Sequence, residues 1–507
     1  MKPIASARRR TTGLLGILAS ATLASTILAA PPARADGPGA GAPWIVSVGD
    51  SYISGEAGRW AGNTNRSSTT IDALGPTAYF DNPGSTAELI RRCHRSWAAE
   101  VFVAGGVNGT TLACSGARTS TFTNSNGHFK PGLDFYSDGA VRKGQARMLE
   151  EFARTHNVKL VPLSIGGNNF NFGDIVAQCV KDFLTSSWLF PDYCKDDSSV
   201  VANMTAANVA AQTAAIKAAI LNVRQAMRNA GYTDSSYTIL VQNYEAAIPK
   251  GSDFRYSQSG FTRQSTGGCG FWNADADWAN TTALPTINGA VQSAAAQAGL
   301  SNVRLLELSK AFDGRQLCSK SVGLLEEQGL ASWKSAGAAD KTEWIDQIRT
   351  VTAGTDYFQQ ESLHPNYWGQ LALRNCIRQA YNGGSPRGGI CTIAGTGLNA
   401  QGEPRMTLGR QLSPPTPSAG AGNPGGGTAA VALCPSYAAL TGVTLHMNGS
   451  TGSVTGACRP LLVSASSVSL GTTTSVTPRI GTRGSRGTPQ QPQDRPVGPE
   501  SVGHHEI

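Results

Sequence analysis

The strongest constraint on the fold is a regular alternation of short apolar segments with longer amphipathic ones. The apolar segments have no polar face, so each predicts a strand that is buried on both sides. They are Pro43–Gly49, Val158–Ile165, Tyr237–Gln242 and Val303–Leu308. Helical spacing of apolar residues occupies Val141–His156, Ala206–Ala230, Pro285–Ala298 and Tyr367–Tyr381. Strands of this kind alternating with helices predict an α/β fold, in which a parallel sheet is covered by helices on each side.

The first 35 residues have the composition of an export signal. Lys2 and Arg8–Arg10 form a basic start, an apolar run extends from Gly13 to Ala30, and Ala33–Ala35 is a small-x-small cleavage site. A retained anchor helix is the alternative, but small residues and Thr dilute the apolar run. We therefore expect a signal peptide at residues 1–35 and a secreted, extracellular protein. The arginine cluster leaves both the Sec and the twin-arginine route open.

Much of the positive charge belongs to this leader. The whole chain carries a formal net charge of +8. The leader holds five basic residues and no acidic ones, so the mature chain would carry +3. Such a small excess gives no support to nucleic-acid binding.

The ten cysteines fall along the chain as near neighbours. No C-x-x-C spacing occurs and no His stands at metal-ligand spacing beside them, so a zinc site is not expected. In an oxidising compartment they predict a disulfide framework, although spacing alone leaves the connectivity open.

Composition also predicts how the chain divides into domains. After the leader, residues 36–395 carry the alternating strand and helix pattern. Residues 396–429 are rich in Pro, Gly and Ser and predict a linker. Residues 430–475 are rich in Val, Thr and Ser and predict a small cysteine-paired β module, and residues 476–507 predict a disordered tail.

Four short motifs stand at or near the ends of predicted elements. Gly49-Asp50-Ser51 ends the first strand, and Ser164–Asn169 follows the second. Ala113–Thr119 lies between them, and Glu361–Pro365 directly precedes the last helix. Each alone is more often ordinary loop sequence. Together, in this order, they supply a serine, backbone N–H groups beside glycines, an amide and a histidine, which are the parts of a serine hydrolase site.

This four-motif combination resembles the SGNH/GDSL hydrolase family over about Trp44 to Cys391. The resemblance implies that Ser51 is the nucleophile and His364 the general base. It also implies an oxyanion hole formed by the backbone N–H groups of Ser51 and Gly116 and the side chain of Asn168. The family fold is a flavodoxin-like sandwich, with a parallel five-stranded sheet between helices. The reaction is ester hydrolysis through an acyl-enzyme, without a metal or an organic cofactor.

The resemblance is strongest to secreted actinobacterial esterases and lipases, in which the first three cysteine pairs are neighbours. The resemblance thus supports disulfides between neighbouring cysteines, and we expect this pairing throughout the chain. The expected pairs are Cys93–Cys114, Cys179–Cys194, Cys269–Cys318, Cys376–Cys391 and Cys434–Cys458.

Two motifs depart from the family pattern. Asn169 stands where the G-G-N-D motif has its Asp, and Glu361 stands where D-x-x-H has its Asp. We expect Glu361 to be the triad acid that orients His364, with a backbone carbonyl of Ser362 or Glu361 as the alternative. Of the other histidines, His94 is expected to be structural, with lining of the cleft as the alternative.

The substrate is less constrained than the chemistry. An aromatic and aliphatic cluster after Asn168 predicts an acyl pocket for lipid or aryl esters, or else packs the neighbouring disulfide loop. Its members are Phe170, Phe172, Trp188, Leu189 and Phe190. Acetyl or acyl esters of polysaccharides are an alternative, and so is a non-catalytic binding protein on a hydrolase scaffold. We expect a monomer that acts on a small ester or lipid.

Overall fold

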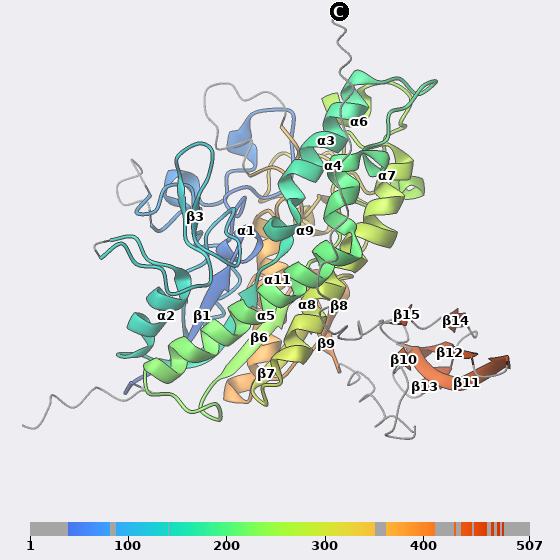
Figure 1. Ribbon diagram of the computed structural model, residues 1–507. Coiled ribbons are helices and arrows are strands. Elements are labelled where there is room, and N and C mark those ends of the chain that lie inside the picture. The colour runs from blue at the N-terminus through green and yellow to red at the C-terminus, as the bar shows by residue number, and fades with distance from the viewer. Residues whose placement is uncertain are drawn as a thin grey trace, which may run out of the picture. The chain divides into compact units, whose positions relative to one another are not determined.

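The computed structural model (Figure 1) describes residues 39–81, 88–139, 141–349 and 361–410 with their side chains. Between residues 430 and 480 it describes the backbone of several strands. The chain separates into one unit that ends at Gly409 and a second that begins at Arg410.

The first unit is built on a seven-stranded sheet. In spatial order its strands are β2 (Asn108–Thr111), β1 (Pro43–Gly49), β5 (Asn157–Ser164), β6 (Thr238–Gln242), β7 (Val303–Glu307), β8 (Gly389–Leu398) and β9 (Pro404–Gly409). All neighbouring pairs are parallel except β8 and β9. The order reverses between β1 and β5, so this edge is the switch point where doubly wound sheets bind ligands, at the carboxyl ends of the strands.

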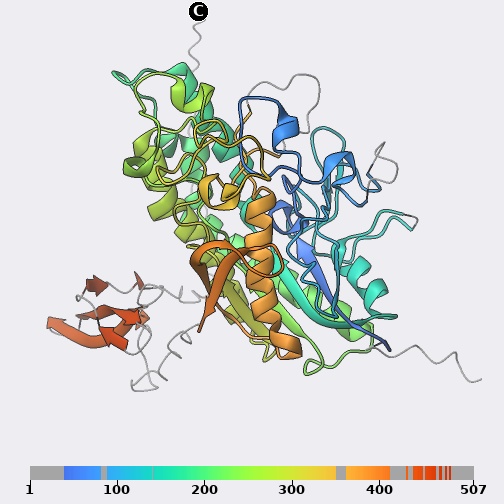
Figure 2. The same ribbon diagram turned by 180° about the vertical axis from the view of Figure 1, so that it is seen from behind.

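Helices connect the strands and cover both faces of the sheet. Their bounds are α1 (Ser51–Ser54), α2 (Gln145–Ala153), α3 (Phe172–Thr185), α4 (Ser198–Val201), α5 (Ala206–Asn229), α6 (Thr262–Ser265), α7 (Asn273–Trp278), α8 (Leu284–Ala298), α9 (Ala338–Lys341) and α11 (Tyr367–Tyr381). Helices α2, α5 and α8 lie on one face, and α11 lies on the other (Figures 1 and 2). A short hairpin of β3 (Phe122–Thr123) and β4 (Phe129–Lys130) lies outside the sheet.

Alternate residues of the central strands build two separate cores. Val46 and Val48 of β1 join the core under α2, α5 and α8, whereas Ile45 joins the core under α11. Because successive strand residues point to opposite faces, a strand covered on both sides must be apolar throughout. This explains why β1, β5 and β6 were recognisable as uninterrupted apolar segments.

The expectation of an α/β fold with a mostly parallel sheet between helices is confirmed, but the number of strands is seven and not five. Strand β2 is the polar segment N-G-T-T at one edge. Strand β9 alternates buried and exposed residues at the other edge, and it lies in the segment predicted to be a linker. Edge strands that are half exposed lack the continuous apolar run by which buried strands are recognised.

Four of the expected disulfides are present. Cys93–Cys114, Cys179–Cys194, Cys269–Cys318 and Cys376–Cys391 are bonded, which confirms the neighbour pairing in this unit. The expected pair Cys434–Cys458 lies outside the residues whose side chains are described. The predicted leader, residues 1–35, lies outside the described part of the chain as well. Of the predicted tail, residues 476–507, the structure describes only the backbone of Val476, at the end of strand β14 (Thr474–Val476), and of β15 (Arg479–Ile480).

The second unit contains β strands. Its longest feature is an antiparallel hairpin of β11 (Ala438–Asn448) and β12 (Thr451–Val463), to which β13 (Val468–Leu470) and β14 (Thr474–Val476) add further pairing. A separate pair joins β10 (Ala430–Val431) to β15 (Arg479–Ile480). Across the described segments of both units, none of the helices is both long and apolar enough to cross a membrane.

Candidate active site

Ser51 is the first residue of α1 and stands directly at the carboxyl end of β1. The turn needs Gly49, whose φ is +143° and where an added Cβ would lie 1.9 Å from the carbonyl oxygen of Ser164. Asp50 caps the helix by accepting a hydrogen bond from the backbone N–H of Tyr52 at 3.2 Å. The serine is thereby held at the switch point of the sheet, 5% exposed.

Asp50 also joins this turn to the next motif. The hydroxyl of Tyr244 donates to its carboxylate at 2.5 Å and accepts from the N–H of Gly167 at 2.9 Å. Burial raises the pKa of Asp50 to about 7, although the hydrogen bonds from Tyr244 and Tyr52 act in the opposite direction. One buried tyrosine therefore links the Ser51 turn to the turn that carries Asn168.

His364 stands on a tight turn just before α11. Leu363 has a φ of +62°, a conformation that costs a non-glycine residue energy and persists only where its surroundings enforce it. Its N–H donates to the carbonyl oxygen of Asp346 at 3.1 Å, and its own carbonyl accepts from the Tyr52 hydroxyl at 3.1 Å. Asn366 then caps α11 by accepting from two N–H groups in the first turn. These contacts fix the backbone on both sides of the imidazole.

Ser51 and His364 meet across 313 positions of sequence, with Ser51 Oγ 2.8 Å from His364 Nε2. The other ring nitrogen, Nδ1, lies 3.0 Å from the carbonyl oxygen of Ser362 and 3.3 Å from that of Glu361. A carbonyl can only accept, so Nδ1 carries the proton and Nε2 is free to accept one from Ser51. This is the geometry of a nucleophile with its general base.

The carboxylate of Glu361 does not lie on His364. Its two oxygens accept hydrogen bonds from Trp60 Nε1 at 2.9 Å and from the Tyr79 hydroxyl. Burial raises the pKa of Glu361, and these two donors and His94 offset that shift only in part. The structure therefore brings together Ser51 and His364 but places the side chain of the expected triad acid elsewhere. The Glu361 carboxylate contacts Trp60 and Tyr79, and only backbone carbonyls of Glu361 and Ser362 face Nδ1 of His364.

The three expected oxyanion donors lie on three turns, and a hydrogen bond links those of Gly116 and Asn168. Among the described residues, the N–H groups of Ser51 and Gly116 have no hydrogen-bond acceptor, as a hole for a developing anion requires. Gly116 adopts a φ of +73°. Asn168 donates one amide hydrogen to the carbonyl oxygen of Ala117 at 2.9 Å, which ties it to the Gly116 turn and leaves its second amide hydrogen for a ligand.

Asn169 binds the segment that follows Gly116. Its carbonyl oxygen accepts from the N–H of Thr119 at 3.1 Å, and its amide donates to the Thr119 hydroxyl at 2.9 Å and to Gln212 at 3.1 Å. An Asp at this position could accept the first bond and receive the hydroxyl, but it could not donate. The Asn found here thus makes a two-way contact between the second and third motifs.

A buried carboxylate that sequence reasoning missed also reaches His364. Glu56 Oε2 lies 3.5 Å from His364 Nε2, while Glu56 Oε1 lies 2.8 Å from His94 Nδ1. The Ser115 hydroxyl donates to the same carboxylate. Burial raises the pKa of Glu56, but His364 and His94 outweigh it and the pKa is lowered overall, so the group is ionised. The available signal was an acidic residue five positions after Ser51 in an otherwise uncharged segment.

His94 is buried and belongs to this cluster. Its ring stacks on Tyr79 with centroids 4.6 Å apart, and its second nitrogen lies 4.0 Å from Glu88. Burial lowers the pKa of His94, but Glu56 and Glu88 outweigh that effect and raise it overall. Because His94 is fully buried, the structure agrees with a structural role for this residue and not with one in lining the cleft.

The expected acyl-pocket residues separate into two groups. Phe170 is fully buried, and Phe172 is half-buried with its ring 6.2 Å from that of Tyr52, which in turn lies 5.2 Å from the His364 ring. The other three extend into solvent after α3. Trp188 is 58%, Leu189 62% and Phe190 82% exposed. Of the five residues, only Phe172 is thus linked to His364, through the ring of Tyr52.

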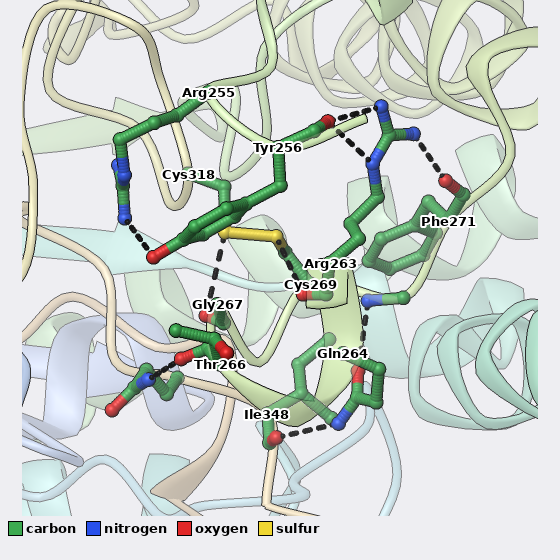
Figure 3. Close-up of a disulfide and its surroundings, with 12 residues drawn as sticks. Arg255, Tyr256, Arg263, Gln264, Thr266, Gly267, Cys269, Phe271, Cys318 and Ile348 are labelled. Atoms are coloured by element: carbon green, nitrogen blue, oxygen red, sulfur yellow. Dashed lines mark hydrogen bonds between the residues drawn. A yellow bond between two sulfur atoms is a disulfide. The ribbon is translucent and has the colours of Figure 1, made fainter. Parts of the chain in front are cut away.

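A separate cavity of about 300 Å³ lies beside the Cys269–Cys318 disulfide. Its lining includes Gln264, Gly268 and Ile348 but neither Ser51 nor His364. Figure 3 shows how tightly this region is cross-linked: Gln264 donates to the Ile348 carbonyl, and Arg263 donates to the carbonyls of Tyr256 and Phe271. Within the described residues, no group of His, Cys, Asp and Glu side chains has the geometry of a metal site.

Comparison with known proteins gives resemblances of fold. No family of known proteins and no characterised protein matches the sequence. Among solved structures, an extracellular lipase from Streptomyces rimosus is 20% identical with a TM-score of 0.33, covering 67% of this chain and 100% of the lipase. A family two carbohydrate esterase from Clostridium thermocellum is 12% identical with a TM-score of 0.30, covering 67% of this chain and 63% of the esterase. Est24, a carbohydrate acetylesterase from Sinorhizobium meliloti, is 10% identical with a TM-score of 0.24, covering 53% and 86%.

The structural neighbours are thus lipases and carbohydrate esterases at low sequence identity.

Proposed function

We propose that this chain is a secreted serine ester hydrolase of the SGNH/GDSL type that forms an acyl-enzyme on Ser51, with His364 as its general base. The observation that carries the proposal is the 2.8 Å contact between Ser51 Oγ and His364 Nε2, with Nδ1 held by the Ser362 carbonyl. That arrangement leaves Nε2 as the proton acceptor and Oγ as the attacking atom.

The reaction follows from these positions. Ser51 Oγ attacks the ester carbonyl while its proton passes to His364 Nε2, and the N–H groups of Ser51 and Gly116 with the Asn168 amide hold the oxyanion. The imidazolium then gives its proton to the departing alcohol. Water, deprotonated by the same imidazole, attacks the acyl-enzyme and releases the acid and Ser51. In this scheme His364 is held by a backbone carbonyl, so the catalytic pair is a dyad.

Two substrate classes are supported by different observations. The Phe172 ring contacts that of Tyr52, which lies beside His364, and apolar rings there favour lipid or aryl esters. The exposure of Trp188, Leu189 and Phe190 removes three residues from any enclosed acyl pocket, which favours short acyl groups such as the acetyl esters of polysaccharides. Export is supported by the four disulfides, which are typical of oxidising compartments.

The test is labelling with a fluorophosphonate probe together with turnover of p-nitrophenyl esters of increasing chain length, phospholipid and acetylated xylan. A hydrolase labels at Ser51, and both labelling and turnover vanish in Ser51→Ala. Ser51→Thr, which keeps a hydroxyl but adds a methyl group, serves as the matched variant for correct folding. A wild-type protein that neither labels nor turns over any of these esters would be a binding protein on this scaffold, and the proposal would be wrong.

A further inference from the structure

In this proposed dyad, no carboxylate occupies the place of the triad acid beside the base. When His364 takes the Ser51 proton it becomes an imidazolium, and in Ser-His-Asp enzymes a carboxylate on Nδ1 stabilises that charge. Here Nδ1 faces carbonyl oxygens of Ser362 and Glu361, and the Glu361 carboxylate is held by Trp60 and Tyr79. A carbonyl orients the ring but carries no net charge.

A carboxylate does reach the imidazole, from the opposite side. Glu56 Oε2 lies 3.5 Å from Nε2, the nitrogen that receives the proton, and the Glu56 side chain is fully buried. A charge pair at this distance away from water interacts strongly, because little solvent screens it. We propose that Glu56 is a positioning residue that supplies, from the Nε2 side, the electrostatic stabilisation of the His364 imidazolium. The inference rests on the proposed function of the same site.

Glu56 is held so that one oxygen remains directed at His364. Its other oxygen binds His94 Nδ1 at 2.8 Å, and Ser115 donates to the carboxylate as well. His94 is itself fixed by stacking on Tyr79 and by Glu88, which accepts from the His94 N–H at 2.6 Å. Ser115 directly precedes Gly116, so the same carboxylate connects the base to the oxyanion turn.

The proton balance of the step is unchanged by Glu56. The proton moves from Ser51 Oγ to His364 Nε2 and then to the leaving alcohol, and at no point does it move to Glu56. The carboxylate stays ionised throughout and lowers the energy of the state in which His364 is positive. Because it acts on the charge and touches no substrate atom, its loss should reduce kcat and leave KM nearly unchanged.

Several other titratable groups surround this carboxylate and bear on its test. They are Asp50, Tyr52, Tyr79, His94, Lys130 and Glu361. Burial keeps both tyrosines neutral by raising their pKa well above 10. Burial lowers the pKa of Lys130 to about 8 and raises that of Asp50 to about 7, so both groups change charge near neutral pH.

The decisive measurement is the acid limb of kcat/KM against pH, because the limb reports the free enzyme's general base. A nearby carboxylate favours the imidazolium, so its removal lets neutral imidazole persist to lower pH. In Glu56→Gln the acid limb should move to lower pH by about one unit, and kcat should fall roughly 10- to 100-fold. Glu56→Asp retains the charge and should keep the limb near its wild-type position.

His94→Gln gives a prediction of opposite sign. It removes an imidazole whose pKa Glu56 and Glu88 raise, and with it the positive charge of the protonated form, while a side-chain amide can still donate to the Glu56 carboxylate. The acid limb should then move to higher pH. A merely structural role for either residue would not move the limb in opposite directions. If Glu56→Gln fails to fold, the His94→Gln shift alone decides, and no shift or a shift to lower pH overturns the proposal.

Further variants test whether other buried groups cause the shift, and a measurement without substrate tests the role of Glu56 apart from ester hydrolysis. Glu100→Gln replaces another fully buried carboxyl group, bonded to Gln242, by an amide. Burial raises the pKa of Glu100 to about 8, so this change removes no charge at acid pH; it controls for a buried Glu-to-Gln replacement and should leave the limb unchanged. Glu56→Gln in an Asp50→Asn background must show the same shift if Asp50 is not its source.

The NMR titration of the His364 imidazole, assigned by the loss of its signal in His364→Ala, follows the same shift without any substrate. Unchanged NMR midpoints overturn the role of Glu56 even if esters are hydrolysed, whereas shifted midpoints without turnover leave that role intact and overturn the hydrolase.

Discussion

His364 Nδ1 lies 3.0 Å from the carbonyl oxygen of Ser362, and Tyr79 and Trp60 hold the carboxylate that sequence spacing assigns to this nitrogen. The tautomer is therefore set by the backbone, on a turn whose Leu363 is held at a φ of +62° by Asp346 and Tyr52. A backbone acceptor cannot be lost by substitution of a side chain. The orientation of the base thus depends on the turn itself, which has consequences for which variants lose activity.

The first consequence concerns Glu361→Gln. In a triad, loss of the acid can cost up to about 10⁴ in kcat. Here the carboxylate faces Trp60 and Tyr79, and Gln can still accept from one of them, so kcat should fall about tenfold or less. Ser51→Ala and His364→Ala set the floor of activity. A fall of Glu361→Gln to within tenfold of that floor would show that the carboxylate reaches His364 during the reaction.

The sequence predicted the buried centre of the fold well and its edges poorly. Strands β1, β5 and β6 are covered on both faces, so their apolar runs coincide with the observed bounds to within a residue or so. Strand β9 buries only alternate residues and lies in a segment whose composition predicts a linker. Its pairing with β8 depends on contacts with distant residues that local composition does not encode.

The site divides in the same way. Ser51, Gly116, Asn168 and His364 lie in short motifs at element ends; in the structure Ser51 contacts His364, and Asn168 is bonded to the turn that carries Gly116. The orientation of Glu361 was not predictable, because it depends on whether Trp60 and Tyr79, some 300 positions away, capture its carboxylate. Glu56 was missed because a single acidic residue in a loop has no pattern until the fold brings it to His364.

The domain boundary can be tested by truncation. A chain that ends after Gly409 keeps β9, which pairs with β8 through Ile390–Gly409 to Ile393–Met406 and lies beside α11. It should retain the Tm and the esterase rate of the full chain on a soluble ester. A chain that ends at residue 400 loses β9, and with it Met406 and Leu408, which belong to the same core as the buried residues of α11. Because this apolar surface would be exposed to water, the Tm should fall by several degrees. Equal Tm values for the two truncations would show that β9 contributes nothing to the catalytic unit.

The pH dependence of stability should reveal the buried carboxyl group of Glu100. Burial raises the pKa of Glu100 to about 8 against an ordinary 4.5. Between those values the unfolded chain has released the proton and the folded protein has kept it, so the free energy of unfolding falls as pH rises. Glu100→Gln removes that slope. Relative to wild type, the variant should gain roughly 1 to 4 kcal/mol between pH 5 and pH 8, measured by denaturant unfolding.

The matched variant for Glu100 is Asp192→Asn, which alters an exposed carboxylate. Its unfolding free energy should run parallel to that of wild type over the same pH range. A Glu100→Gln curve that also runs parallel to wild type would mean that the carboxyl group is ionised in the folded protein.

Asn168 and Asn169 are neighbours for which the proposed oxyanion hole predicts different losses of kcat. Asn168 is tied to Ala117 by one amide hydrogen and offers the other to the site, whereas both polar atoms of Asn169 are bound to Thr119 and Gln212. Loss of one oxyanion donor costs about 10² to 10³ in kcat, because the donor acts on the charge that develops in the transition state. Asn168→Ala should therefore lower kcat by that factor with little change in KM. Asn169→Asp keeps an acceptor for Thr119, and its kcat should stay within about tenfold of wild type, as expected for loss of one neutral hydrogen bond.

The two variants are compared on one p-nitrophenyl ester, with Tm measured on each. Equal losses of kcat in both would indicate that the turn fails as a whole, and a loss in KM alone for Asn168→Ala would place its amide on the ground-state substrate and not on the oxyanion.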